Sequence, residues 1–305
     1  YWKEIASSYD YFFTIQRGQF FDQLKSIGVD NYYYLPQACL PSVHRKINLS
    51  FSEMKKYSAD VSFMGSGYYN RVQSLPRLLD RDLKIWGTEW LLESPLGKRV
   101  QNRNRRLSSE EIIKVYNATQ ININLHSSTY HNGVNPGGDF VNPRTFEILA
   151  CGGFQLVDNR SELAELINIG TEVVTFKSID ELSQKVDYYL SHENEAKSIA
   201  ARGQKRILKE HTFQHRMCEM LIHIFTDKLD QLKDRMDDKF RDPVNYCIDE
   251  AGPSSDLAKY LEQFRGESNF SIDSMTERIG KGRGDLSKEE LLILMVDQLV
   301  KYECR

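Results

Sequence analysis

The sequence predicts an α/β protein with a doubly wound parallel sheet, and three observations lead to this fold class. From residue 58 onward, short apolar runs alternate with longer segments whose apolar residues follow the helical period. Five such runs occur, and five strands that alternate with helices form a parallel sheet covered by helices on both faces. At 305 residues the chain is also long enough to bury the core that such a sheet requires.

The predicted elements of this sheet follow one another between residues 58 and 226. We expect strands at 60–65, 82–87, 121–126, 153–158 and 172–176. We expect helices at roughly 68–80, 108–118, 143–151, 161–168 and 178–191. In a Rossmann-like sheet of this kind, the loops after the strand carboxyl ends form the ligand crevice, so binding residues are expected there.

The regions before and after the sheet differ from it. Residues 1–57 suit a strand, a helix and a second strand, of which only the run at 29–36 ends clearly, at a proline. This is too little to fold alone, and we interpret it as the remnant of a preceding Rossmann-like domain. From residue 193 onward the chain keeps helical spacing, and residues 227–305 are predicted to form an all-helical extension.

Two features divide this extension. Pro243 and the later AGPSS stretch predict a break in the helices between residues 241 and 256. Ser287 and Glu290 have the spacing of a capping box and predict the start of the last helix. Such an extension would pack on the α/β domain or on a partner, including a second copy of the chain.

Composition and charge exclude several classes of function. A formal net charge of -3 gives no overall bias toward nucleic acid or an anionic membrane, so any anion site must be local. No apolar run approaches the ~20 residues that cross a bilayer. The five cysteines are scattered without a CxxC pair or a Cys/His cluster, which predicts no metal site and free thiols in a reducing cytoplasm.

The stretch GGDFVNPRTFEILACGG at 137–153 predicts the start of a helix. Asn142 is a good N-cap, and Pro143 suits the first helical turn because it lacks an N–H group that would be left unpaired there. The positive end of the helix dipole therefore points into the preceding loop. Helix starts of this kind bind anions, phosphate above all.

The residues around this helix start fit a phosphate cradle. Gly137 and Gly138 let the backbone of the loop approach a ligand closely. Arg144, beside Thr145 in the first turn, can hold two phosphate oxygens at once. The basic run at 98–106 is predicted to be a solvated loop near the same phosphates.

Two further loops carry candidate residues. After the first strand, Gly65 and Ser66 begin a tight turn, and Arg71 lies on the next helix, where it reaches a diphosphate or is simply solvated. The absence of the third glycine of G-x-G-x-x-G argues against a nicotinamide or flavin dehydrogenase. His126 ends the third strand, where it would bind phosphate, act as a base or pair locally.

Two carboxylates flank the helix start. Asp139 and Glu147 are the types of residue that accept hydrogen bonds from sugar or ribose hydroxyls. The alternative is that Glu147 pairs with a neighbouring Lys or Arg and Asp139 belongs only to a turn. The spacing alone leaves both interpretations open.

This stretch resembles the donor-site signature of GT-B glycosyltransferases, and the CgeB-like (spore maturation protein B-like) glycosyltransferases in particular. An acidic residue is followed after seven positions by Glu in E-x-x-A-C-G, and R-x-F-E is matched by Arg144, Phe146 and Glu147. The resemblance also includes VSFMGSGYYNR and LKIWGTEW upstream and spans roughly residues 28–225. Asp139 stands where the family usually has Glu, and F-V-N replaces the G-F-G that often follows.

The resemblance implies a metal-independent glycosyltransferase that uses a nucleotide-sugar, most simply a UDP-sugar, as donor substrate and has no other cofactor. Glu147 would hold the ribose, and Asp139 would contact the sugar. The implied catalytic residues are Asp139, Arg144 and His126. The implied donor-binding residues are Gly65, Ser66, Arg71, Gly137, Gly138, Asn142, Arg144, Thr145 and Glu147.

The acceptor, a saccharide or a protein, is left open, as is the stereochemical outcome. A second hypothesis also stays open: a nucleotide-binding or nucleotide-sugar-binding module without transferase activity, which acts through its helical extension as an interaction or regulatory protein. The change from Glu to Asp at residue 139 and the shortness of the segment before residue 58 favour this second hypothesis.

Overall fold

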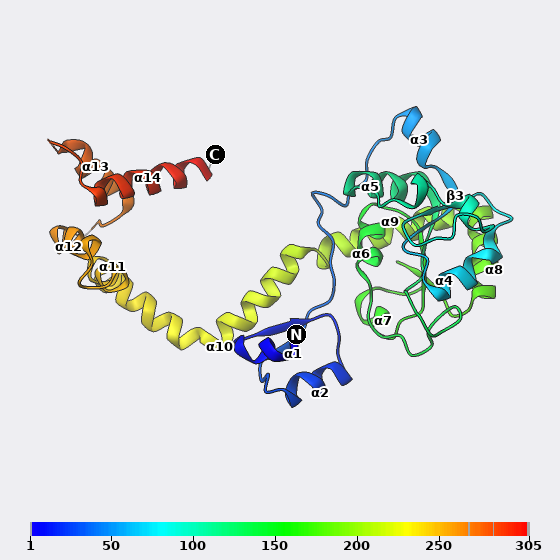
Figure 1. The fold of residues 1–305 in the computed structure, drawn as a ribbon, viewed down its shortest axis with the longest axis horizontal. Coiled ribbons are helices and arrows are strands. Elements are labelled where there is room, and N and C mark those ends of the chain that lie inside the picture. Colours follow the sequence, from blue (N-terminus) through cyan, green and yellow to red (C-terminus); the bar gives the residue numbers. More distant parts are fainter. Residues whose placement is uncertain (1, 268, 283, 304–305) are drawn as a thin grey trace. The chain divides into compact units, whose positions relative to one another are not determined.

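The computed structural model describes residues 2–267, 269–282 and 284–303. The chain forms two compact units, Tyr1–Ile222 and His223–Arg305 (Figure 1). The first unit contains a five-stranded parallel sheet with the order β4-β3-β5-β6-β7, so the predicted doubly wound sheet is confirmed. Its strands are β3 (Ala59–Met64), β4 (Leu83–Trp86), β5 (Thr119–Asn124), β6 (Gln155–Asp158) and β7 (Val174–Phe176).

Helices follow each strand, close to the predicted positions. They are α4 (Tyr69–Ser74), α5 (Ser109–Ala118), α6 (Pro143–Ala150), α7 (Leu163–Leu166), α8 (Ile179–Ser191) and α9 (Glu193–Glu210). A 3-10 helix, Leu75–Leu78, continues directly from α4. The starts of these helices agree with local signals: Ser108 and Glu111 form a capping box on α5, and the side chain of Asn142 caps α6.

The two faces of the sheet bury different helices. On one face, Val61 and Phe63 of β3 and their neighbours on β5 pack with Leu182 of α8 and Ile199 of α9. On the other face, Trp86 at the end of β4 packs with Val115 of α5. Burial of apolar side chains on both faces contributes most of the stability of such a sheet.

The segment before the sheet forms a small β-α-β unit, as the sequence predicts. It consists of α1 (Trp2–Ile5), β1 (Phe12–Thr14), α2 (Gln19–Ser26) and β2 (Tyr32–Tyr34), followed by α3 (Phe51–Tyr57). The strands β1 and β2 pair in parallel. The hydroxyl of Tyr34 donates a hydrogen bond to Glu162 at 2.8 Å, and Arg17 reaches Glu165 at 2.8 Å. These contacts attach the unit to α7 and to Glu162, the residue before it.

A buried histidine strengthens the attachment at the end of α9. The ring Nε2–H of His211 donates to the carbonyl of Leu166 at 2.9 Å, and Nδ1 accepts from the guanidinium of Arg216 at 2.7 Å. Arg216 also donates to the carbonyl of Pro36 at 2.8 Å. Burial, together with the positive charge of Arg216, lowers the pKa of His211 to about 4.

The second unit is helical. It contains α11 (Pro243–Ala251), α12 (Asp256–Leu261), α13 (Ile272–Lys281) and α14 (Lys288–Glu303), while the long α10 (Phe213–Arg241) begins in the first unit and ends in the second. Val244, Ile248 and Phe264 are among the buried residues of its own core. Ser287 and Glu290 exchange hydrogen bonds at 2.7 and 3.2 Å, which confirms the predicted capping box.

The predicted break between residues 241 and 256 is wrong for most of its length. The helix α11 begins at Pro243, because proline is tolerated in the first helical turn. The side chain of Asp242 caps it by accepting from the N–H of Asn245 at 2.9 Å. The helices are interrupted at Asp242, between α10 and α11, and again at residues 252–255.

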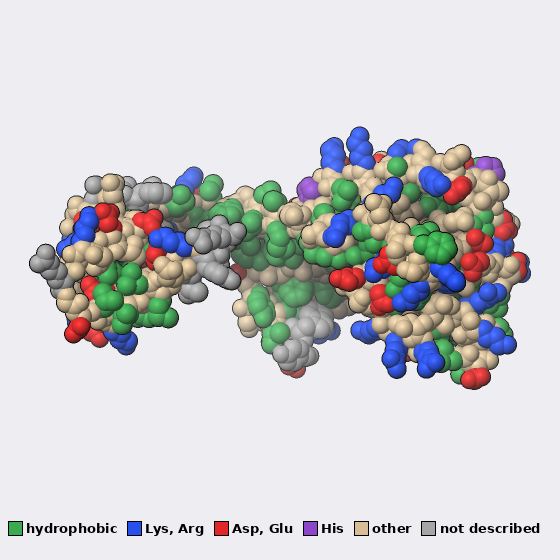
Figure 2. All heavy atoms as spheres, turned by 90° about the horizontal axis from the view of Figure 1, so that it is seen from above, with side chains coloured by type: hydrophobic (Ala, Val, Ile, Leu, Met, Phe, Trp, Pro, Cys, Tyr) green, Lys and Arg blue, Asp and Glu red, His purple; other side chains and the backbone are tan. Residues whose placement is uncertain are grey.

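The surface carries charges of both signs. On the face seen in Figure 2, Lys and Arg side chains of the first unit are interspersed with Asp and Glu. None of the helices in the described part of the chain combines the length and the apolar character that crossing a bilayer requires.

The buried neutral His211 makes the stability of the protein depend on pH. Unfolded histidine has a pKa near ~6.5, so between that value and about 4 the unfolded chain binds a proton that the folded chain does not. Lowering the pH from 7 to 5 should therefore cost about 2 kcal/mol of unfolding free energy at this residue. Urea unfolding at the two pH values should show a smaller loss for His211→Gln, and the exposed control His131→Gln should lose as much as the wild type.

Candidate functional site

A cleft of ≈ 410 Å³ lies at the carboxyl ends of β3 and β4, beside the start of α6. This is the edge of the sheet where ligands bind in open α/β folds. Met64, Leu107 and Ile112 are among its apolar wall residues. Its charged residues are Arg106, Arg144 and Glu147.

A larger cavity, ≈ 680 Å³, lies at the opposite edge of the sheet. It borders the amino ends of β3 and β5, at Ala59 and Thr119, and the segment Gly152–Phe154 before β6. Volume alone would favour this cavity over the smaller cleft. The smaller cleft is the better candidate because the strand carboxyl ends and a helix start meet there.

Glycines bring the two loops of the cleft together. The chain turns at Gly87 with a φ of 141°, and a Cβ atom there would collide with the carbonyl oxygen of Gly65. The same carbonyl accepts a hydrogen bond from the indole of Trp90 at 2.9 Å. The hydroxyls of Ser66 and Thr88 lie 2.9 Å apart and link the loops a second time. Gly65 and Ser66 therefore line the cleft as a fixed surface.

A buried polar network holds the start of α6. The amide of Asn124 donates to Asn142 Oδ1 and to the hydroxyl of Thr145, both at 3.0 Å. Gln155 of β6 donates to the carbonyl of Thr145 at 2.9 Å. Thr145 is completely buried, so its side chain fixes the helix to the strands and does not face the cleft.

Arg106 and Arg144 are the positive groups of the cleft. Neither forms an ion pair with a described residue. Arg81, in contrast, pairs with Asp187 at 2.7 Å. Arg144 is also close enough to Arg71 for its charge to contribute, after burial, to lowering the pKa of Arg71 to about 10. Two free guanidinium groups in one cleft form a site for an anion with several oxygens.

Glu147 lies between the cleft and a histidine that the sequence analysis did not identify. Its Oε1 is 4.0 Å from Nε2 of His44. The N–H of Leu40 donates to Nδ1 of His44 at 3.1 Å, so the proton of the neutral ring is on Nε2 and faces Glu147. His44 belongs to the segment before the sheet, and no motif in that segment indicated this contact.

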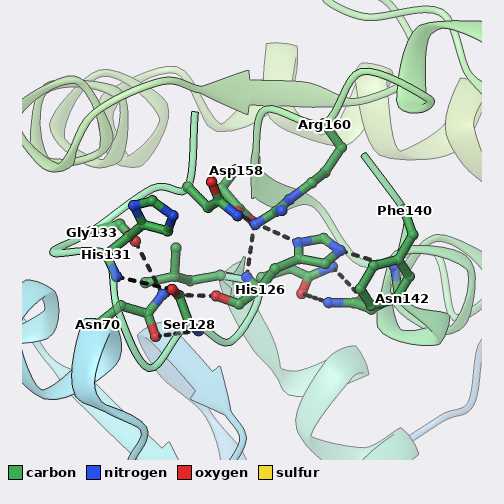
Figure 3. A network of polar contacts seen from close by, with 12 residues as sticks. Asn70, His126, Ser128, His131, Gly133, Phe140, Asn142, Asp158 and Arg160 are labelled. Carbon is green, nitrogen blue, oxygen red and sulfur yellow. Dashed lines mark hydrogen bonds and ion pairs between the residues drawn. The ribbon is translucent and has the colours of Figure 1, made fainter. Parts of the chain in front are cut away.

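His126 is held in one orientation and one tautomer (Figure 3). Its backbone N–H and ring Nδ1 bond to Asp158 Oδ1 at 2.9 and 2.6 Å, and its Nε2 accepts from the backbone N–H of Asn142 at 2.9 Å. It is only 3% exposed, and this burial lowers its pKa. The imidazole is therefore neutral, and both of its nitrogens are bonded inside the protein.

Asp158 carries the negative charge of this network. Its second oxygen pairs with Arg160, which is also buried. Burial alone would raise the pKa of Asp158, but the contact with His126 and the charge of Arg160 hold the pKa below its ordinary value. The aspartate therefore stays ionised at the end of β6.

Arg71 is also turned inward. It is 3% exposed, and its Nε and Nη2 donate to the carbonyl of Leu125 at 3.1 and 2.9 Å. Its Nη1 donates to the carbonyl of Ser66 at 3.0 Å. The guanidinium thus holds the loop after β3 against the end of β5, and it lies behind the cleft.

The glycine loop before α6 lies on Arg160. A Cβ atom at Gly138 would collide with the Arg160 guanidinium, so this close approach is to the protein itself. The N–H of Gly137 donates to Asn135 Oδ1 at 3.0 Å. Asp139 is exposed, and its carboxylate accepts from the N–H of Phe140 at 2.7 Å.

The structure therefore brings together four of the predicted residues in one cleft, namely Gly65, Ser66, Arg144 and Glu147. Arg71, His126, Asn142 and Thr145 lie behind it as buried supports. Gly137, Gly138 and Asp139 lie in the neighbouring loop and do not line the cleft. Arg106, from the basic run at 98–106, joins the cleft.

Asp158 should be far more important for stability than an exposed aspartate with the same type of partner. Asp158→Asn leaves the buried Arg160 without its counter-charge, so we expect a loss of about 3–5 kcal/mol in unfolding free energy. Asp187→Asn removes the exposed partner of Arg81 and should cost less than about 1 kcal/mol. Urea unfolding of the two variants measures the difference, and equal losses would contradict the assigned role of Asp158.

Comparison with known proteins shows the family and the fold of this chain. Residues 70–222, half of the chain, match the family model described as glycosyl transferase-like. The spore protein CgeB of Bacillus subtilis is 26% identical over 203 residues, which cover 62% of this chain and 60% of that protein. This chain thus spans about 60% of the length of that relative.

Two solved structures share the fold. Sucrose-phosphate synthase from Thermosynechococcus elongatus has a TM-score of 0.53 and 12% identity, over 74% of this chain and 61% of that chain. HepE from Anabaena, solved in complex with UDP-glucose, has a TM-score of 0.53 and 12% identity, over 73% of this chain and 67% of that chain. Both the GT-B fold and the resemblance to CgeB-like proteins are confirmed. The chain belongs to the glycosyl transferase-like family.

Proposed function

We propose that this chain binds a UDP-sugar in the cleft at the ends of β3 and β4 and forms the donor side of an enzyme that transfers the sugar to an acceptor. The observation that carries the proposal is the charge arrangement of the cleft, where Arg106 and Arg144 are free of ion pairs within the described residues and Glu147 stands beside them. The family match and the UDP-glucose complex of HepE, a protein of the same fold, support the choice of ligand.

Each charged group has a role in this proposal. The two guanidinium groups bind the diphosphate and stabilise the negative charge that builds up on it as the sugar leaves. Because these charges come from the protein, the reaction is proposed to need no metal ion. The Glu147 carboxylate accepts hydrogen bonds from the ribose hydroxyls, and His44 behind it limits its movement.

The remaining candidate residues do not carry the proposal. His126 acts by placing the start of α6, because its ring nitrogens are bonded to Asp158 and Asn142. Contact of Asp139 with the sugar stays a prediction, as do the acceptor, a saccharide or a protein, the cytoplasmic location and self-association through the helical extension. The family match favours a transferase over a non-catalytic binding module.

Glu147 provides the direct test of the proposed site. Calorimetric titration should show binding of UDP to the wild type, and Glu147→Ala should weaken it by about 1–3 kcal/mol because the ribose hydroxyls lose their acceptor. Glu93→Ala, at an exposed glutamate outside the cleft, is the control and should bind like the wild type.

Two results would count against the proposal. If the wild type binds none of UDP, UDP-sugars, GDP-sugars or dTDP-sugars, the cleft is not a donor site. If Glu147→Ala folds normally and binds UDP with unchanged affinity, Glu147 is not part of the site.

Arg144 should contact only the phosphates of the bound nucleotide. Arg144→Ala is expected to weaken UDP binding by about 1.5–3 kcal/mol, since hydrogen bonds to a charged group are lost, while uridine binding stays unchanged. Arg105→Ala removes an exposed arginine next to Arg106 that does not line the cleft and should have little effect. Titrations in the presence of EDTA test at the same time that no metal ion is needed, and an equal loss for uridine would contradict the phosphate role.

A further inference from the structure

Two buried hydrogen-bond donors in the cleft lack a partner. Within the described residues, four buried side-chain polar atoms make no hydrogen bond: Trp86 Nε1, Tyr116 Oη, Thr119 Oγ1 and Arg160 Nε. Both Trp86 and Tyr116 line the ≈ 410 Å³ cleft, and each side chain is only 2% exposed. An unpaired buried donor costs free energy, so two of them in one candidate site call for an explanation.

We propose that Tyr116 and Trp86 are specificity residues that donate hydrogen bonds to the carbonyl oxygens of a uracil-type base bound in this cleft. The inference rests on the proposed function, because it assumes that a nucleotide enters the cleft. It goes further by assigning recognition of the base to two side chains whose polar atoms have no hydrogen-bond partner of good geometry within the described residues.

The position of Tyr116 supports this assignment. Its ring comes from α5 and packs with Ile113 and Ile148, next to the half-buried Met64. Its hydroxyl faces Glu147: after burial, the carboxylate of Glu147 is the main cause that raises the pKa of Tyr116. The hydroxyl makes no hydrogen bond of good geometry and has only a weak contact with this carboxylate, so its O–H can turn to a ligand.

Trp86 presents the second donor from the end of β4. Its ring packs on Tyr57, with the ring centres 5.6 Å apart, and on Val115. Leu107 and Met64 are half-buried, pack against it and line the same cleft. We expect a bound base to displace these two side chains and so to reach the indole N–H and the phenol O–H.

The side chains that line the cleft favour one kind of ligand. Apolar side chains around a few fixed donors are typical of small-molecule sites, and the cleft volume lies within their usual range of roughly 300–1,000 Å³. Two donors require two acceptors on the ligand, which uracil offers as its carbonyl oxygens. Cytosine replaces one carbonyl by an amino group, which is itself a donor and would leave one protein donor unpaired.

The test uses variants that remove only the donor groups. Tyr116→Phe deletes the hydroxyl, and Trp86→Phe deletes the indole N–H, while both keep an aromatic ring. Calorimetry should show UDP affinity reduced about three- to tenfold in each variant. The wild type should prefer UDP to CDP, and at least one variant should reduce this preference, while affinity for inorganic pyrophosphate stays unchanged in both.

A matched control is available in the same domain. Thr119→Val removes another buried hydroxyl that has no partner, but Thr119 lies at the opposite edge of the sheet. It should leave UDP affinity unchanged. The melting temperature should not fall in Tyr116→Phe, because the hydroxyl that is removed makes no hydrogen bond in the free protein.

The outcomes separate the two proposals. If the wild type binds no nucleotide, the proposed function fails and this inference fails with it. If the wild type binds UDP but Tyr116→Phe binds UDP and CDP with wild-type affinities, only the inference about the base is overturned. If Tyr116→Phe melts well below the wild type, the hydroxyl has a structural role, and this result would also overturn the inference about the base. Should Trp86→Phe fail to fold, Tyr116→Phe decides the question alone.

Discussion

The buried carboxylate of Asp158 is the group on which one side of the site depends. It accepts hydrogen bonds from the backbone and ring of His126 and pairs with Arg160, so its charge is compensated inside the protein. Because Nδ1 of His126 donates to this carboxylate, Nε2 is left as an acceptor and receives the N–H of Asn142. One buried charge thus selects the histidine tautomer, and the tautomer places the start of α6, the helix that carries Arg144 and Glu147.

The sequence was sufficient to predict the sheet because its elements depend on local signals. The apolar runs that became β3 to β7 are bounded by turn residues, and parallel strands covered on both faces need little else to be recognised. The capping residues Asn142 and Ser287 placed helix starts correctly for the same reason. The prediction failed for the residues after Pro243: the helix does end before this proline, but Pro243 then begins α11, and local sequence does not distinguish these two uses.

The site was harder to predict because the direction of a side chain depends on tertiary contacts. Arg71 follows the loop after β3, as a phosphate-binding arginine would, yet its guanidinium is satisfied by the carbonyls of Leu125 and Ser66. Leu125 lies 54 positions further along the chain, so no local pattern could show the bond. His44 and Glu147 are likewise far apart in the sequence and meet only in the fold. The pair Arg144 and Glu147 was predictable because it lies one turn apart on a single helix.

The three arginines near the cleft show what distinguishes a binding group from a structural one. Arg71 has made its hydrogen bonds within the protein and contributes to the shape of the loop. Arg106 and Arg144 keep their donors for another molecule, at the cost of leaving two like charges in one cleft. The donors of Trp86 and Tyr116 carry no charge, but they too make no hydrogen bond of good geometry within the described residues. A site that binds a polar ligand strongly must keep polar groups free of partners within the protein, and where such a group is buried, as in Trp86 and Tyr116, part of the binding free energy comes from the removal of that cost.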